Sequence, residues 1–276
     1  MINVLFFEIT VGLYAGGTLA YLGYLITSYP KAAWVGRLLL GGGFIVHCAA
    51  LVLRYIEAGH VPVTSLHESL SFFACLLVGS FLLLRLYYAV EIMGAFVAPF
   101  ALLLVIWAAV LPKEIIPLPA LLKSWWLPIH VTFAFVGEAV FALACCAGVI
   151  YLIQERLLKS KRAAGLSRRL PSLEVLDEIN YHALTIGFLL LTIGIVTGAA
   201  WAERAWGAYW RWDPKQNWSL ATWLLYAILL HQRLAINWRG KKAAVMAIVG
   251  FGSVLFTFLG VNLLLHGPHT YAEWLR

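Results

Sequence analysis

The chain has 276 residues, of which 62% are hydrophobic and only 12% are charged. A soluble domain has about twice that charged fraction, so the composition excludes an ordinary soluble protein and indicates helices that cross a membrane. The net charge of +7 lies in short segments between apolar runs, which suggests membrane orientation and not nucleic acid binding.

Eight apolar runs are long enough, or nearly so, to cross a bilayer as helices of roughly 20 residues. The first run lacks the basic leader and cleavage site of a signal peptide, so we expect it to be retained. We therefore predict an all-α polytopic transmembrane helical bundle of about eight spans. In chain order these are 6–29, 34–56, 66–90, 94–111, 129–157, 176–200, 220–234 (whose start can extend back to Trp218) and 243–265.

The sequence contains no obvious soluble domain, so residues 1–276 are predicted to form a single integral membrane domain. Residues 1–123 form a four-span N-terminal half. Residues 124–276 form a C-terminal half with a tryptophan-rich segment at 201–218. The four cysteines lie inside apolar runs without a CxxC motif, which favours small core residues over a disulfide framework or a redox relay.

The positions of Lys and Arg predict the orientation. One set of connections holds 13 of the 20 basic residues and is therefore assigned to the cytoplasmic side. Both termini and the tryptophan-rich segment then lie on the outer side. Three cations of that segment (Arg204, Arg211 and Lys215) run against the bias, so they require another explanation.

The segment 201–218 is unusually aromatic for a connection between spans. An interfacial belt explains isolated tryptophans elsewhere in the chain, but not five of them with Gly, Asp and Pro in between. Tryptophan is a large apolar plate with one donor, so this segment is predicted to hold a flat ligand. Its aromatic residues are Trp201, Trp206, Tyr209, Trp210, Trp212 and Trp218.

Two histidines flank this segment at the predicted outer interface: His130 opens the fifth span and His269 follows the eighth. Each alone can be a polar interfacial residue, but the pair favours axial ligation of a haem iron. His266, only three residues from His269, is its main competitor. His231 lies near the inner end of the seventh span, where a ligand and an interfacial residue are equally compatible with its position. A second inner ligand can come from His182 or from another chain.

The remaining histidines favour structural roles. His47 lies in the middle of the second span, where it can bond within the bundle or line a pathway. His60 and His67 lie near a predicted capping box, in which Thr64 or Ser65 caps the third span and Glu68 completes the box.

Haem is a flat apolar disc with two propionates on one edge, so its site needs aromatic plates, cations and axial ligands. Arg211 and Lys215 are the candidate propionate partners. Asp213 and Pro214 are predicted to cap and start the following helix. The candidate plates are Trp206, Trp210, Trp212 and Trp218, with Tyr209 as a further one.

The run 206–218, with its Trp212-Asp213-Pro214-Lys215, resembles the tryptophan-rich "WWD" signature of haem-handling membrane proteins. The chain is similar to system II cytochrome c biogenesis proteins of the CcsA/ResC type. Two positions depart from that pattern: Gln216 stands where Glu is usual, and His67 where Tyr is more frequent. Supporting matches lie at 59–62 with 68–69, 124–131, 176–178, 198–202 and 260–262 with 269–271.

The resemblance implies transport of haem b across the membrane and its covalent attachment to the CxxCH segment of apocytochrome c on the outer side. It implies a cytochrome c haem lyase that works with a CcsB/ResB-type membrane partner in a bacterial cytoplasmic or a thylakoid membrane. His130 and His269 match the external haem ligands. His231 matches a transmembrane haem ligand, and Asp213 belongs to the matching tryptophan motif.

Two other functions remain open at this point. A haem-delivery or regulatory relative, such as a system I haem-handling subunit or a HemX-like protein, holds haem but attaches nothing. A quinone- or lipid-binding module uses its tryptophans as an interfacial platform, but does not call for histidines on both sides of them.

Overall fold

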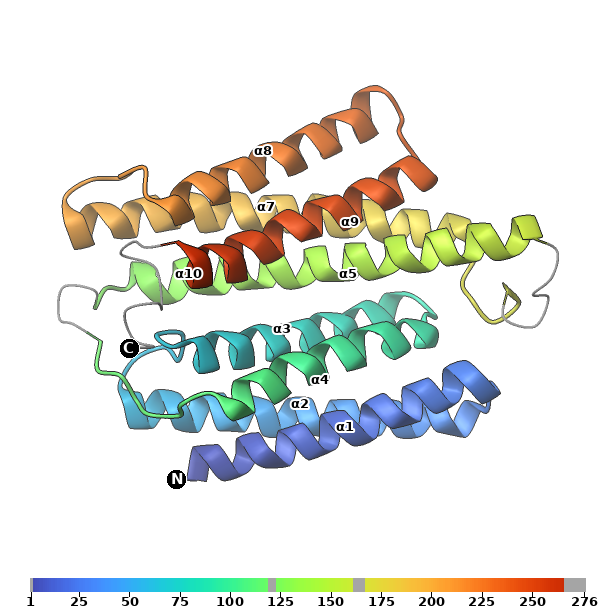
Figure 1. Cartoon of the computed structure of the whole chain (residues 1–276), viewed down its shortest axis with the longest axis horizontal. Coiled ribbons are helices and arrows are strands. Elements are labelled where there is room, and N and C mark those ends of the chain that lie inside the picture. The colour runs from blue at the N-terminus through green and yellow to red at the C-terminus, as the bar shows by residue number, and fades with distance from the viewer. Residues whose placement is uncertain (1, 119–122, 161–166, 266–276) are drawn as a thin grey trace. The chain divides into compact units, whose positions relative to one another are not determined.

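The computed structural model describes residues 2–118, 123–160 and 167–265, and these residues form helices and connections without any strand. The chain divides into two compact units, which are described separately (Figure 1). Unit 1 comprises Met1–Leu118 and Ala164–Pro171, and unit 2 comprises Pro119–Ala163 and Ser172–Arg276. The all-α prediction is confirmed.

Unit 1 contains four long helices joined by short connections, so consecutive helices run antiparallel. Pro30 starts the second helix at the position where its missing N–H is not needed, and Gly59 ends it with a φ of +70°. The elements are α1 (Ile2–Thr27), α2 (Pro30–Ala58), α3 (Leu66–Tyr87), η1 (Glu91–Met93) and α4 (Gly94–Val110).

Unit 2 is built on two very long helices, α5 (Trp126–Ser160) and α7 (Leu173–Trp206). Glycines let their backbones approach closely: a Cβ at Gly137 lies 3.1 Å from the backbone nitrogen of Leu191. The unit continues with α8 (Pro214–Ala235) and α9 (Lys241–Leu255), then a π-helical turn η3 (Phe256–Gly260) and α10 (Val261–Leu264).

Each of the eight predicted spans coincides with a helix. Seven of them are long and apolar enough to cross a membrane. The remaining helix, α8, corresponds to the predicted span 220–234. It is long enough but less apolar, because Lys215, Gln216 and Asn217 occupy its start and the residues from His231 to Arg233 occupy its end. The side of the membrane on which each end lies stays a prediction.

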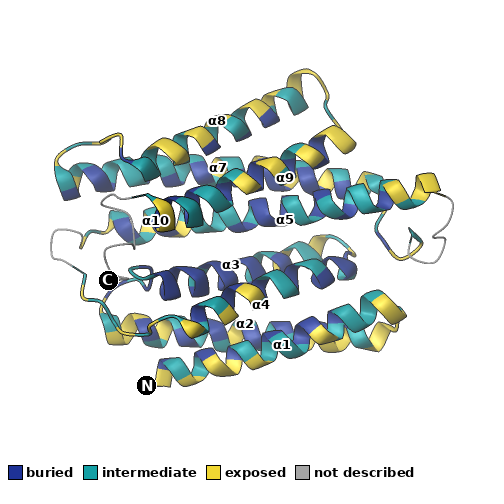
Figure 2. Ribbon diagram, in the orientation of Figure 1, coloured by how far each residue is buried: buried dark blue, intermediate teal, exposed yellow. Residues whose placement is uncertain are grey.

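The surface of the helices is apolar where a soluble protein would be charged. Leu19, Ile45 and Leu86 expose 72%, 70% and 76% of their surfaces, and exposed positions alternate with buried ones along α1 and α2 (Figure 2). Exposing such an apolar surface to water costs free energy, whereas contact with the hydrocarbon of a membrane does not. The pattern agrees with an integral membrane protein.

The interior of unit 1 contains a hydrogen-bonded histidine. His47 is fully buried, with one ring nitrogen 3.2 Å from the Tyr14 hydroxyl and the other 2.8 Å from the Ser71 hydroxyl. These bonds link α1, α2 and α3, which confirms that His47 bonds within the bundle.

The predicted capping box of α3 is confirmed with a small variation. Ser65 is the cap and accepts the Glu68 N–H, whereas the Glu68 carboxylate accepts the N–H and hydroxyl of Thr64. The other carboxylate oxygen of Glu68 pairs with the buried Arg54 at 2.8 Å. Arg54 also donates to the carbonyls of Lys113 and Glu114, so this cluster anchors the segment after α4.

Candidate functional site

His130 lies one turn into α5 and bonds to the facing helix α7. Its Nδ1 is 2.7 Å from the carbonyl oxygen of Gly194. Because a carbonyl only accepts, Nδ1 must carry the hydrogen, which places the lone pair of the neutral ring on Nε2. Histidines that bind metals are commonly oriented by such a second bond to a backbone carbonyl. The tautomer and the ring plane of His130 are therefore set by α7.

Gly198 leaves space for the His130 ring because it has no side chain. A Cβ at Gly198 would lie 2.6 Å from Cε1 and Nδ1 of the ring, closer than real side chains approach. Any larger residue at this position would therefore displace the imidazole. Gly198 was not predicted as a site residue, although it lies in the run 198–202 on which the resemblance rests.

An aromatic series runs from His130 to the end of α7. Trp201 is buried and nearly parallel to the His130 ring, with centroids 6.3 Å apart and planes 11° apart. Trp206 meets Trp201 edge-on at 5.0 Å, and the Arg211 guanidinium lies 5.8 Å from the Trp206 ring centroid. Two predicted site residues, Trp206 and Arg211, are thus connected to His130 through Trp201.

The irregular part of the tryptophan-rich segment is shorter than the sequence indicated. Helix α7 continues to Trp206 and ends at Gly207, whose φ is +73° and whose N–H bonds to Glu203. Helix α8 starts at Pro214, and the Asp213 carboxylate accepts the N–H groups of Lys215 and Gln216. The structural role predicted for Asp213 and Pro214 is confirmed. Only residues 207–213 form a loop.

This loop is fixed by bonds from α8 back to its backbone. The Gln216 side-chain oxygen accepts the Arg211 N–H at 2.8 Å, and the Asn217 amide donates to the Trp212 carbonyl at 2.9 Å. Trp212 has a φ of +57°, which is rare for a bulky residue, and it exposes 70% of its surface. Such strain is characteristic of functional loops that their surroundings hold in place.

Trp210 is a half-buried residue of the loop. Its indole nitrogen is buried and has no hydrogen-bond acceptor among the described residues, while its ring meets Trp212 edge-on at 6.0 Å. An unsatisfied buried donor costs about 1–3 kcal/mol. The Trp210 N–H is thus available to a ligand that brings an acceptor.

Two charged residues, Glu138 on α5 and Lys215 at the start of α8, interact electrostatically. Glu138 is on α5, two turns beyond His130, and its Oε2 is buried without a hydrogen bond in the part of the chain that the structure describes. Lys215 interacts electrostatically with both Glu138 and Asp213, but forms no ion pair within the described ranges. The Lys215 ammonium is therefore not held in a salt bridge with a single carboxylate of the described residues. Glu138 was not anticipated from the sequence.

Trp218 is placed by the π-helical turn. Its ring meets Phe256 edge-on at 4.5 Å, and the Thr257 hydroxyl lies 3.3 Å from its carbonyl oxygen. π-Helical turns occur often at functional sites. Trp218 lies on α8 and not in the loop, and 39% of its surface is exposed.

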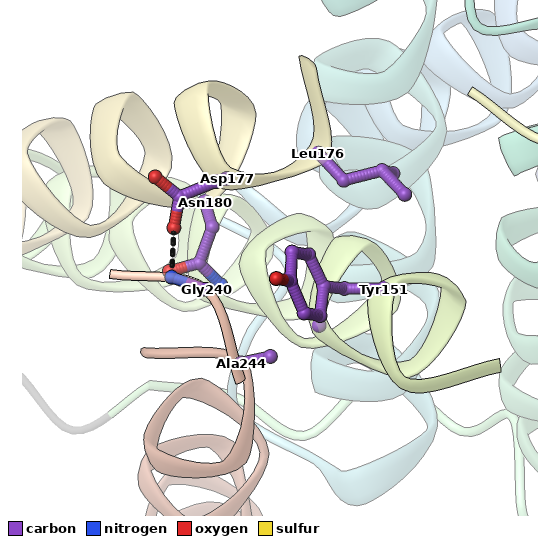
Figure 3. Close-up of a pocket in the computed structure, with 7 residues that line it drawn as sticks. Tyr151, Leu176, Asp177, Asn180, Gly240 and Ala244 are labelled. Atoms are coloured by element: carbon purple, nitrogen blue, oxygen red, sulfur yellow. Dashed lines mark hydrogen bonds between the residues drawn. The ribbon is translucent and has the colours of Figure 1, made fainter. Parts of the chain in front are cut away.

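At the other end of unit 2, His231 is exposed on α8. Two residues further on, Arg233 turns inward and pairs with both oxygens of Asp177 at 2.8 and 2.6 Å. The Asp177 carboxylate also accepts the Gly240 N–H at 2.7 Å, just before α9 (Figure 3). One carboxylate of α7 therefore fixes the end of α8 and the start of α9.

The recess around Asp177 in Figure 3 is too small to hold a ligand. His182 is exposed on α7, with its Nδ1 4.0 Å from a Glu178 carboxylate oxygen. Whether it reaches His231 stays a prediction. His266 and His269 lie outside the described residues.

Comparison with known proteins adds independent findings. A family model described as Cytochrome C assembly protein matches residues 63–269. The chain is 38% identical to a "Cytochrome c biogenesis protein CcsA" of Chlamydomonas reinhardtii, over 93% of this chain and 74% of that one. It is 34% identical to a CcsA of Synechococcus sp. (strain CC9605), over 98% of this chain and 99% of that one.

The fold also has a solved counterpart. A structure described as "Cytochrome c Heme Lyase CcmF" matches with a TM-score of 0.66 and 19% identity. The match covers 94% of this chain and 47% of that chain. At this identity the likeness concerns the fold alone.

Proposed function

The chain belongs to the cytochrome C assembly protein family, and we propose that it carries haem b across the membrane and holds it for attachment to apocytochrome c. Haem is then the substrate of the protein and not a resident cofactor. The observation that carries the proposal is the His130 ring, oriented through Nδ1–H by Gly194 and accommodated by Gly198, with the lone pair on Nε2.

The described residues fit a haem. The disc needs flat apolar surfaces, which the side chains of Trp206, Trp210 and Trp212 offer. The propionates need donors, which the buried Trp210 N–H and the Lys215 ammonium supply. Arg211 is already engaged with Trp206, so we assign it to the rim of the site.

The contribution of the protein to the attachment is positioning. His130 and His269 hold the iron from its two faces, and the tryptophans exclude water from the disc. Apocytochrome c brings the two thiols of its CxxCH segment, and each S–H adds across a vinyl group to give a thioether. The addition is balanced without an oxidant or a reductant, and it requires no nucleophile from this chain. We therefore propose a holocytochrome c synthase activity.

The inner half of the transport path is proposed at His231. Its exposed position means that a second ligand must approach from outside α8. A CcsB/ResB-type partner is our candidate source, and His182 on α7 is the alternative within the chain. With this orientation the tryptophan-rich segment lies on the outer side of a bacterial cytoplasmic or a thylakoid membrane, among membrane lipids.

The test is to express the chain with its partner and an apocytochrome in a strain that lacks maturation. We expect H130A combined with H269A to abolish both the haem absorption of the purified protein and the formation of covalent cytochrome c. W210F should weaken haem retention, whereas W125F, a matched change at a tryptophan that exposes 86% of its surface, should not. Unchanged haem content in the double variant would refute the site. Haem without attachment in the wild type would favour a delivery protein instead.

A further inference from the structure

Two thiols of unit 1, on neighbouring helices, lie in contact. Cys48 on α2 and Cys75 on α3 have their Sγ atoms 3.7 Å apart, and both are free thiols. The other two cysteines, Cys145 and Cys146, are consecutive residues of one helix. Their side chains diverge by about 100°, so they do not face each other.

The two thiols differ in access. Cys75 exposes only 3% of its surface, whereas Cys48 is half-buried. Cys48 lies three residues after Ile45 and four before Val52, which expose 70% and 55% of their surfaces on the same side of α2. A reagent dissolved in the lipid therefore reaches Cys48 from this apolar face, whereas Cys75 is buried and is not reached directly.

The helices that carry the thiols are held together at this level. His47, next to Cys48 in the chain, is 2.8 Å from the hydroxyl of Ser71, which precedes Cys75 by one turn of α3. Because both ring nitrogens of His47 are engaged, the histidine ties α2 to α3 and to Tyr14 of α1. The approach of the two sulfurs is thus a fixed property of the packing.

We propose that Cys48 and Cys75 form a reversible dithiol–disulfide pair that a lipid-soluble quinone oxidises. Two S–H bonds break and one S–S bond forms. The two hydrogens and two electrons pass to the quinone, which becomes a quinol. The sulfurs must approach from 3.7 Å to a bond length of about 2.05 Å.

The disulfide would replace a van der Waals contact between α2 and α3 by a covalent link. It would then restrict any sliding of α3 along α2, including the Glu68 end that binds Arg54. This inference rests only on unit 1 and is independent of the proposed haem chemistry.

The test counts free thiols in membranes that contain the full chain. Samples are treated with decylubiquinone or with oxidised glutathione, which does not enter the lipid, then denatured and labelled with a maleimide-polyethylene glycol. We expect four labels without oxidant or with glutathione, and two after the quinone, with four restored by dithiothreitol. C48S and C75S should each keep three labels under all conditions.

The double variant C145S/C146S isolates the pair and should go from two labels to none. Four labels in the quinone-treated wild type would overturn the proposal. So would a loss of labels in C48S, or a disulfide-linked dimer on a non-reducing gel, because each places the reaction on other sulfurs. Wild-type amounts of the serine variants in the membrane fraction confirm that they are assembled.

Discussion

Gly198 offers the sharpest test of the proposed haem site, because replacing it by Ala adds a single methyl group next to the His130 ring. The new Cβ would stand 2.6 Å from the ring, and an ordinary contact begins near 3.4 Å. The imidazole must therefore move by about 0.8 Å, away from the position in which Nδ1–H bonds to Gly194 at 2.7 Å.

The expected size of the effect follows from this displacement. Overpacking of a fitted site costs about 1–3 kcal/mol, and the strained hydrogen bond to Gly194 adds to the loss of orientation. If the full amount is lost from ligand binding, haem is held about 5- to 150-fold more weakly. The substitution should not destabilise helix α7, since Ala is a better helix former than Gly by roughly 0.5–1 kcal/mol.

The assay is the haem absorption of the detergent-purified variant, titrated with haem. G252A is the matched control, because nothing lies within 4 Å of a Cβ at that position of α9. Comparison of H130A with H130A/G198A completes a double-mutant cycle. Wild-type haem binding by G198A would refute our account of the ring, as would an equal loss caused by G198A when His130 is absent.

Three further predictions concern stability and the loop. D177N leaves the guanidinium of Arg233 without its carboxylate and should cost about 3–5 kcal/mol, which lowers the Tm in detergent by roughly 6 °C or more; an unchanged Tm contradicts the role of this pair. Ser28 has a φ of +58° and a buried hydroxyl that finds no partner in the described part of the chain, so S28G should stabilise by up to about 1 kcal/mol, and a lower Tm would show that the position is not strained. Q216E keeps the acceptor for the Arg211 N–H and should retain haem like the wild type, whereas Q216L should bind it about fivefold more weakly; equal binding by all three proteins would exclude this bond from the site.

The Gln216 prediction also bears on the departure from the family pattern. The resemblance described above predicts Glu at this position, but the contact here is an acceptor for a backbone N–H, which an amide and a carboxylate both provide. The bond itself therefore does not require a charge at this position.

The helices were predictable because each apolar run is long, and the caps because their chemistry is local. Ser65, Glu68 and Asp213 act within four residues of their own position. The end of α7 was less predictable. The predicted span ends at Ala200, where the apolar run stops. No helix breaker occurs between Ala200 and Gly207, so the helix continues to Trp206.

The site residues that the sequence did not indicate depend on helix packing. Gly198 matters only because α7 brings it opposite His130, which lies 68 positions earlier in the chain. Asp177 meets Arg233 across 56 positions, and Glu138 of α5 interacts electrostatically with Lys215, the second residue of α8. No local pattern encodes which turn of one helix faces which turn of another.

The carboxylate of Asp177 has a consequence for how the chain can evolve. It accepts from a side chain, Arg233, and from a main-chain group, the N–H of Gly240. A changed side chain can be compensated by a second substitution, but a main-chain donor is present with every residue except proline. Among relatives, position 233 should therefore vary between long cationic donors, whereas position 177 should keep an acceptor and change last.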